Sequence, residues 1–263
     1  MRCIVGLLFL VSQSLYAATV ELHLPVYSDD SHIYYHELLE QALLDAGHQP
    51  QIILSSNLPQ KRAESMLRNG QLSLVWLLAT EERNQDPAFT PIKIGLTNGL
   101  IGHRLLLVPK SDVDSYRFVS NLDDFKALDK TGGFGKNWFD VAVWQHNQLA
   151  TVEVDGEWRR LYKMVANKKR GIDYFSRGFT EIINESLQHP YLAIEPYLLL
   201  NYQRDFQFYV SSKDPTLAPI LEQALEKAVD SGLMDKMIEE FWREDFDLLN
   251  YRKRVVIPLA TPK

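Results

Sequence analysis

The stretch from Gly70 to Arg83, GQLSLVWLLATEER, decides the fold class of this chain. Its apolar run, Leu72 to Leu77, is short enough for a strand that is buried on both faces, as the strands of parallel sheets are. Before it, strand-like and helix-like patterns alternate at residues 19–26 (strand), 34–46 (helix), 51–54 (strand) and 59–68 (helix). This order indicates an α/β fold with mostly parallel sheets and helices on both faces.

A second series of the same kind follows the apolar segment 99–108, which Pro109 ends. We predict strands at residues 130–134, 152–154, 171–175, 192–200 and 206–210, helices at 119–128, 158–168 and 179–187, and a loop opening a further helix at 135–145. Apolar residues at helical spacing predict two more helices, at 215–231 and 233–242. Two α/β series in one chain predict two lobes.

The composition is that of an ordinary folded protein. Hydrophobic residues make up 46% of the 263 residues and charged residues 24%, which excludes a disordered or coiled-coil chain. With a formal net charge of -6, the chain lacks the electrostatic footprint expected of a nucleic-acid binder. We therefore expect no nucleic-acid partner.

The first 18 residues have the three-part layout of a secretory signal peptide. A positive start at Arg2 precedes the apolar run CIVGLLFLV, Cys3 to Val11, and small and polar residues follow as far as Ala18. The apolar run is well below the roughly 18 residues of a membrane span. We predict residues 1–17 as the signal peptide and therefore an exported, periplasmic protein. Since Cys3 is the only cysteine, the mature chain has no cysteine nucleophile and no cysteine-based metal site.

Four stretches, taken in order, resemble the periplasmic solute-binding proteins of ABC importers, in the type II amino-acid-binding branch (family 3). They are the strand and Thr-x-x-Arg of residues 70–83, SNLDDFK at 120–126, the helix, KRGID and strand of 166–175, and SKDPTLAPILEQALEKAVDSGLMDKMIEEFW at 212–242. The resemblance implies the two-lobe, type II periplasmic-binding-protein fold, with residues 18–105 and 205–263 in lobe 1 and residues 106–204 in lobe 2. It also implies that a small solute binds between the lobes, which close on it by a hinge motion.

The resemblance further implies a non-enzymatic, monomeric receptor without a cofactor or metal, which hands its solute to the membrane subunits of an importer or to a sensor. The position that holds a ligand carboxylate falls on Arg83, and Thr80 three residues earlier adds a hydroxyl. A guanidinium matches a carboxylate with two parallel hydrogen bonds. Alternatively, Arg83 is a solvated arginine that follows Glu81 and Glu82.

The loop TGGFGKNWFD, residues 131–140, is a second candidate for ligand binding. A glycine lets backbone N–H groups approach an anion, and the start of the following helix favours negative charge. We therefore expect Gly135, Lys136, Asn137 and Trp138 at the ligand. The alternative is a tight strand-to-helix turn.

Aromatic and cationic side chains complete the expected site. Tyr27 and Trp76 each end a predicted strand and are expected as apolar walls, although aromatic residues in such places also serve as core. The acid that holds a ligand ammonium in the family falls near Gly178, next to Arg177. Arg177 favours a second anionic group on the ligand, or else it pairs with Glu181 four residues later. We expect an anionic or amino-acid-like solute.

Two other functions stay open at this stage, because fold alone does not decide function. An exported lyase-like or dehydratase-like enzyme on the same scaffold needs an acid in the cleft, and Glu181 and Asp29 are its candidates. A ligand-free interaction module accounts for the departures from the family pattern. One such departure is Leu77 and Leu78, which stand where amino-acid binders have hydroxyl residues.

We expect the mature N-terminus at Ala18 or Thr19, because small residues follow the apolar run there. N-terminal sequencing of the exported protein checks this expectation, and a sequence that begins at Met1 would contradict it.

Overall fold

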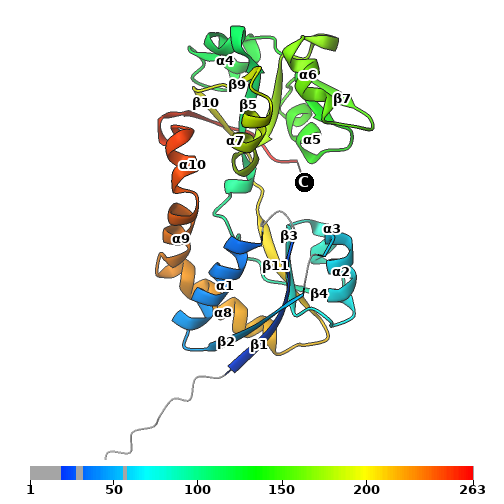
Figure 1. The fold of residues 1–263 in the computed structure, drawn as a ribbon, viewed down its shortest axis with the longest axis vertical. Helices are drawn as coiled ribbons and strands as arrows, with labels where there is room; N and C mark the ends of the chain where they lie inside the picture. The colour runs from blue at the N-terminus through cyan, green and yellow to red at the C-terminus, as the bar shows by residue number, and fades with distance from the viewer. Residues whose placement is uncertain (1–18, 28–31, 56–57, 263) are drawn as a thin grey trace, which may run out of the picture.

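Two lobes are stacked along the long axis of the molecule and joined at a narrow waist (Figure 1). This computed structural model describes residues 19–27, 32–55 and 58–262, so the predicted signal peptide and Asp29 lie outside the described residues. The predicted α/β fold class is confirmed, since each lobe combines a sheet with covering helices, and parallel and antiparallel strand pairs are mixed rather than mostly parallel. Within the described ranges, no helix is both long and apolar enough to cross a membrane.

The first lobe contains a parallel pair of strands and an antiparallel three-stranded sheet. The pair is β1 (Thr19–Pro25) and β2 (Gln49–Ser55), and the sheet has the order β3 (Leu74–Leu78), β11 (Phe206–Ser211), β4 (Phe89–Pro91). Two hydrogen bonds of 2.9 Å between His23 and Ser73 join the pair to the sheet. Helices α1 (Ile33–Asp45) and α8 (Leu217–Asp230) pack together on one side, and α2 (Gln60–Arg68) and α3 (Glu81–Asn84) lie on the other (Figure 1).

The second lobe contains a sheet with the order β12-β10-β5-β8-β6-β7, in which β9 pairs with β5. The strands are β5 (His103–Pro109), β6 (Gly132–Gly135), β7 (Thr151–Val154), β8 (Tyr174–Gly178), β9 (Leu192–Ile194), β10 (Leu198–Asn201) and β12 (Val255–Pro258). The helices are α4 (Leu122–Ala127), α5 (Phe139–His146), α6 (Arg160–Ala166) and α7 (Phe179–Gln188). Strand β6 runs parallel to β7 and β8, whereas β5, which enters from the first lobe, runs antiparallel to β8 and β10.

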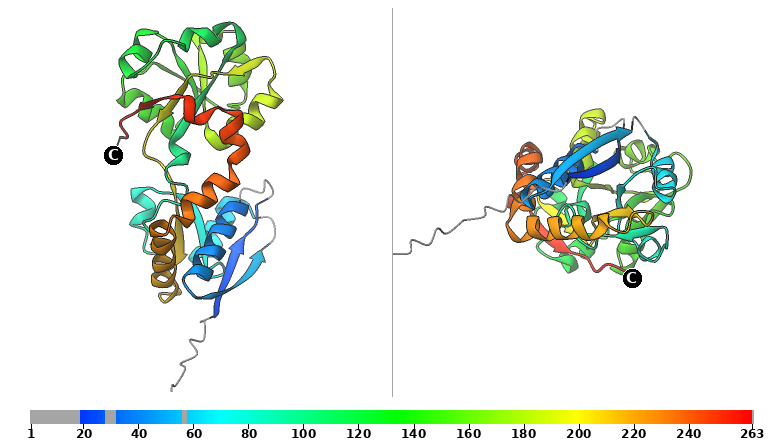
Figure 2. Two further views of the ribbon diagram at one scale, coloured as in Figure 1. Left: turned by 90° about the vertical axis from the view of Figure 1, so that its left-hand side faces the viewer. Right: turned by 90° about the horizontal axis from the view of Figure 1, so that it is seen from below.

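The end of the chain departs from the expectation that residues 205–263 all belong to lobe 1. Helices α9 (Leu233–Phe241) and α10 (Arg243–Leu248) rise from the first lobe to the second (Figure 2), and β12 then pairs in parallel with β10. This pairing buries Ile257 completely. The side chain of Asn147 both donates to and accepts from the backbone of Ala260, at 2.8 and 2.9 Å. The last strand is therefore held by the second lobe because its apolar side chain and its backbone find partners there.

The chain passes between the lobes three times, and two side chains tie these passages together. Asp205, on the second passage, accepts hydrogen bonds from the backbone N–H groups of Thr97 and Gly99 on the first, at 3.2 and 2.8 Å. On the third passage, the Tyr251 hydroxyl lies 2.6 Å from Nδ1 of His103 at the start of β5. The position of one lobe relative to the other is therefore set by hydrogen bonds as well as by chain connectivity.

The burial of His103 predicts that the free energy of unfolding depends on pH. Burial lowers the pKa of His103 to about 4, and the charge of Arg104 adds to the effect. An unfolded histidine has a pKa of about 6.5, so the unfolded chain binds the proton first as the pH falls. The contribution of neutral His103 is thus present above pH 6.5 and lost as the pH falls toward 4. We expect the free energy of unfolding to fall less steeply between about pH 7 and 5 in His103→Gln, which keeps an acceptor for Tyr251.

Denaturant titrations of the wild-type protein and of His103→Gln between about pH 7 and 5 measure this difference in slope. Buried Glu195 acts in the opposite sense, because burial raises its pKa to about 7 and its contribution is lost as the pH rises from about 4.5. That contribution is common to both proteins and cancels in the comparison. Equal slopes would show that His103 carries no such linkage.

Candidate functional site

A cavity of about 940 Å³ opens between the two lobes, and we call it the cleft. The first lobe and α9, with the residue that follows it, supply an aromatic wall, made of Tyr27, Tyr34, Tyr35, Trp76, Phe206, Phe241 and Trp242. The second lobe faces this wall with Arg104, Gly178, Thr180 and Glu181. Each lobe therefore contributes a different kind of surface, apolar on one side and charged on the other.

The aromatic wall is packed before any ligand arrives. The ring of Tyr35 stacks on Trp76 with centroids 4.9 Å apart and an interplanar angle of 17°, while Tyr27 meets Trp76 edge-on at 5.1 Å. Trp76 comes from the buried strand β3 and Tyr35 from α1, and each is 5% exposed. Tyr27 and Trp76, both expected at the ligand, thus line one cavity, and their contact with a ligand stays a prediction.

A recess of about 270 Å³ continues the cleft into the second lobe. It shares Arg104 and Glu181 with the cleft, and its other lining residues are Trp138, Asp140, Trp158, Ser176 and Arg177. Ser176 is 2% exposed, and its hydroxyl has no hydrogen-bond partner among the described residues. A buried polar group of this kind is costly unless something pairs with it, so the recess has unused hydrogen-bonding capacity.

Arg104 is a candidate binding residue that the sequence reasoning missed. Its Nε lies 2.8 Å from a carboxylate oxygen of Asp140, and its Nη2 donates to the hydroxyl of Tyr202 at 2.7 Å. Its Nη1 lies 2.8 Å from the place that a Cβ on Gly178 would take, so the missing side chain there makes room for the guanidinium. In the sequence, the one signal for Arg104 was its positive charge directly before the apolar residues of β5, HRLLLVP.

Arg177 lines the recess, and its guanidinium is already paired within the protein. Its Nε and Nη2 each donate to the Glu185 carboxylate at 2.6 Å, and Nη2 also lies 3.1 Å from Oε2 of Glu181. Its guanidinium packs 5.3 Å from the Trp138 ring centroid. The Glu181 pairing was the alternative stated from sequence, whereas the Glu185 pairing, eight residues away, was not expected. With two carboxylates on one guanidinium, little positive charge is left for an anion.

The loop expected to bind an anion uses its own backbone N–H groups. Lys136 N donates to Val154 O at 3.1 Å, Asn137 N to the Glu153 carboxylate at 3.0 Å, and Trp138 N to Gly135 O at 3.2 Å. The Trp138 indole covers Gly135, where a Cβ would come within 2.4 Å of the ring. These hydrogen bonds form the tight strand-to-helix turn that was the stated alternative, and contact between this loop and a ligand stays a prediction.

The side chain of Lys136, in the same loop, forms an exposed ion pair. The ammonium of Lys136 lies 2.7 Å from the Asp155 carboxylate, and both side chains are more than half exposed. Lys136 therefore points to solvent with its charge already matched.

Arg83 lies beside the cleft and contacts its own lobe. Its Nη1 donates to the Leu78 carbonyl at 3.0 Å, and its Nη2 lies 3.8 Å from Glu64. Thr80 begins α3, and its hydroxyl accepts from Arg83 N at 3.2 Å. Leu78 lines the cleft, whereas Arg83 is not among its lining residues. Among the described residues, no contact joins Arg83 to the loop of residues 135–138, so its role toward a ligand stays a prediction.

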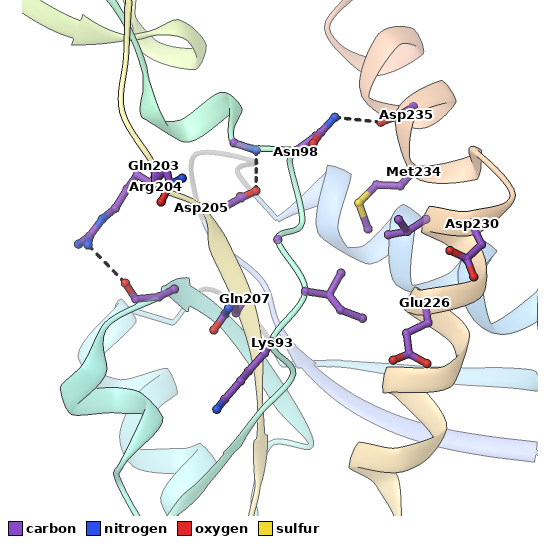
Figure 3. Close-up of a pocket in the computed structure, with 15 residues that line it drawn as sticks. Lys93, Asn98, Gln203, Arg204, Asp205, Gln207, Glu226, Asp230, Met234 and Asp235 are labelled. Carbon is purple, nitrogen blue, oxygen red and sulfur yellow. Dashed lines mark hydrogen bonds between the residues drawn. The ribbon is translucent and has the colours of Figure 1, made fainter. Parts of the chain in front are cut away.

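A second large cavity, of about 960 Å³, lies behind the waist between the crossing segments and helices α8 and α9 (Figure 3). It has no lining residue from the sheet of the second lobe. Some of its polar groups are engaged in the hinge: Asp205 holds the crossing segments together, and Asn98 Nδ2 lies 3.2 Å from an Asp235 carboxylate oxygen, whereas buried Oε1 of Gln207 has no hydrogen-bond partner among the described residues. We therefore assign the candidate site to the cleft and its recess.

Comparison with known proteins supports the fold. No protein-family model matches the sequence, and no curated protein does. Among solved structures, a chain named as the second substrate-binding domain of an amino acid ABC transporter from Streptococcus pneumoniae Canada MDR_19A has a TM-score of 0.55 at 16% identity, covering 84% of this chain and 98% of that one.

Two further solved structures also resemble this chain over most of its length. The YckB protein of Bacillus subtilis has a TM-score of 0.54 at 15% identity, with 85% and 90% of the two chains covered. The GluR0 ligand-binding core in complex with L-glutamate has a TM-score of 0.50 at 13% identity, with 86% and 98% covered. At these identities the likeness establishes the architecture alone, and the chain has the two-lobe fold of substrate-binding proteins.

Proposed function

We propose that this chain is an exported receptor that binds one small solute, anionic or amino-acid-like, in the cleft, and that its lobes close on the solute. It works in the periplasm as a monomer, without enzymatic activity, cofactor or nucleic acid. It delivers the solute to the membrane subunits of an ABC importer or reports it to a sensor.

The observation that carries this proposal is the cleft itself. Its volume of about 940 Å³ falls within the range of roughly 300–1,000 Å³ typical of small-molecule sites. An apolar wall with a few charged groups opposite is also the usual composition of such sites. Because the two walls belong to different lobes joined by short crossings, a hinge motion brings both against one ligand.

Amino-acid-like solutes are better supported than simple anions. Among the groups expected to hold an anion, the loop amides of residues 136–138, Lys136 and Arg177 are already paired inside the protein. Among proteins of the same fold, one is named for an amino acid transporter and another was solved with L-glutamate. Amino acids are therefore the first ligands to test.

The test is a ligand screen by thermal unfolding, followed by calorimetry of the hits, across amino acids, amines and small carboxylates. We expect at least one class to raise the Tm, and we expect Tyr27→Leu to weaken its binding about tenfold, because the aromatic wall loses a ring. Tyr191→Leu is the matched control, since Tyr191 is an exposed aromatic residue outside the cleft. No Tm shift with any class, or turnover of a hit to a product, would count against a binding role.

A further inference from the structure

The third passage between the lobes is helical and runs apart from the first two. It consists of α9 and α10 and leads into β12, and we call these three elements, residues 233–258, the strap. Figures 1 and 2 both show α9 and α10 beside the waist that the first two crossings form. The cavity of about 960 Å³ behind the waist lies between those crossings and helices α8 and α9. A link placed away from a hinge must shift whenever two lobes rotate about that hinge, so the strap bears directly on lobe motion.

The α9 end of the strap is packed into the first lobe. Met234 and Ile238 of α9 are buried, and the ring of Trp242 lies 4.5 Å from that of Tyr34 on α1, measured between centroids. The Tyr34 hydroxyl in turn donates to the carbonyl of Leu96 on the first crossing at 2.7 Å. Helix α9 is therefore part of the first lobe.

The other end of the strap is anchored in the second lobe by a buried guanidinium. Nε of Arg254 donates to the carbonyl of Leu249, the residue after α10, at 2.8 Å, and Nη1 donates to the carbonyl of Leu198 on β10 at 2.9 Å. The Arg254 side chain is 2% exposed. On α10 itself, Phe246 packs on Phe179 of α7 with ring centroids 4.8 Å apart. Together with the pairing of β12 and β10, these contacts make α10 and β12 part of the second lobe.

The strap is thus fixed at both ends, and Trp242 is the joint between them. Trp242 ends α9 and begins α10, and its φ of -104° and ψ of 21° depart from helical values. Backbone hydrogen bonds persist on both sides of the joint, from Trp242 N to Ile238 O at 3.1 Å and from Phe246 N to Trp242 O at 2.9 Å. The two helices therefore meet in a hydrogen-bonded kink rather than in a loose loop.

We infer that the strap restrains the two lobes, so that their separation stays within a narrow range and any lobe motion bends the strap at Trp242. The first two crossings, tied together at Asp205, form one narrow hinge, which by itself leaves several directions of rotation open. A third connection away from that hinge, anchored at both ends, removes most of these directions. The inference goes beyond the proposed binding function, since the restraint acts with or without a solute.

Interlobe distances measured by double electron–electron resonance test the restraint without a ligand. Spin labels are attached to exposed positions of the two lobes, Gln41→Cys on α1 and Asp123→Cys on α4, in a Cys3→Ser background that has no other cysteine. The loosened variant combines Arg243→Gly and Glu244→Gly, because glycine weakens the first turn of α10 while both anchors remain. We expect a narrow distance distribution for the intact strap and a broader one for the loosened strap.

The matched control combines Glu222→Gly and Gln223→Gly, two exposed positions of α8, a helix that lies wholly in the first lobe. It should leave the distribution unchanged, and the Tm of each variant shows whether it is folded. Should the loosened variant not fold, Ile257→Ala takes its place, because it weakens the hold of β12 on the second lobe and should broaden the distribution in the same way.

An equal width in the intact and the loosened protein, or an equal broadening in the α8 control, overturns the inference. Neither result bears on whether the cleft binds a solute, which the ligand screen decides separately.

Discussion

The carboxylate of Asp205 is the point on which the arrangement of the two lobes depends. Besides Thr97 and Gly99 on the first crossing, it accepts from the N–H of Phe206 at the start of β11. Burial raises the pKa of this carboxyl, and the hydrogen bonds oppose that rise. The approach is so close that a Cβ at Gly95 would come within 2.6 Å of the carboxylate, so the first crossing needs glycine there. The two crossings thus form one unit, and the cleft opens beside it.

A second constraint on the structure is the free-energy cost of burying charged side chains on the second-lobe side of the cleft. An unpaired buried guanidinium costs several kcal/mol, so Arg104 and Arg177 are present only together with Asp140 and Glu185. These partners hold the guanidinium groups in fixed positions, and they also remove most of their attraction for an outside anion. Arg104 and Arg177 are therefore less able to attract an anion than two guanidinium groups without partners would be.

Much of the fold could be predicted from the sequence, because helices and central strands have recognisable patterns of apolar residues within their own segments. The helix expected at 34–46 is observed as α1, and the strand within residues 72–77 as β3. The three-residue strand β4 and the terminal strand β12 were missed, since each is defined by a partner strand rather than by its own pattern. Helix α10 was missed for a similar reason. It is defined by a long-range contact, in which its Phe246 packs on Phe179 of the second lobe.

The candidate site was harder to predict, because residue type shows what a side chain can bind but not what already binds it. Lys136 and the loop amides find Asp155, Val154 and Glu153 on the neighbouring strand or just beyond it. Arg104 gave a weak signal, and Gly178 gave none, since its importance lies in the side chain it lacks.

The two lobes supply different kinds of side chain to the cleft. The aromatic wall lies mainly on the first lobe and the charged groups on the second, so an open molecule can test the shape of a solute before its charge. Trp242 connects the two stages, since it lines the cleft, packs on Tyr34 with ring centroids 4.5 Å apart, and forms the joint between α9 and α10. A solute bound in the cleft would therefore contact the residue that joins α9 to α10, so the proposed binding site and the third crossing between the lobes share one side chain.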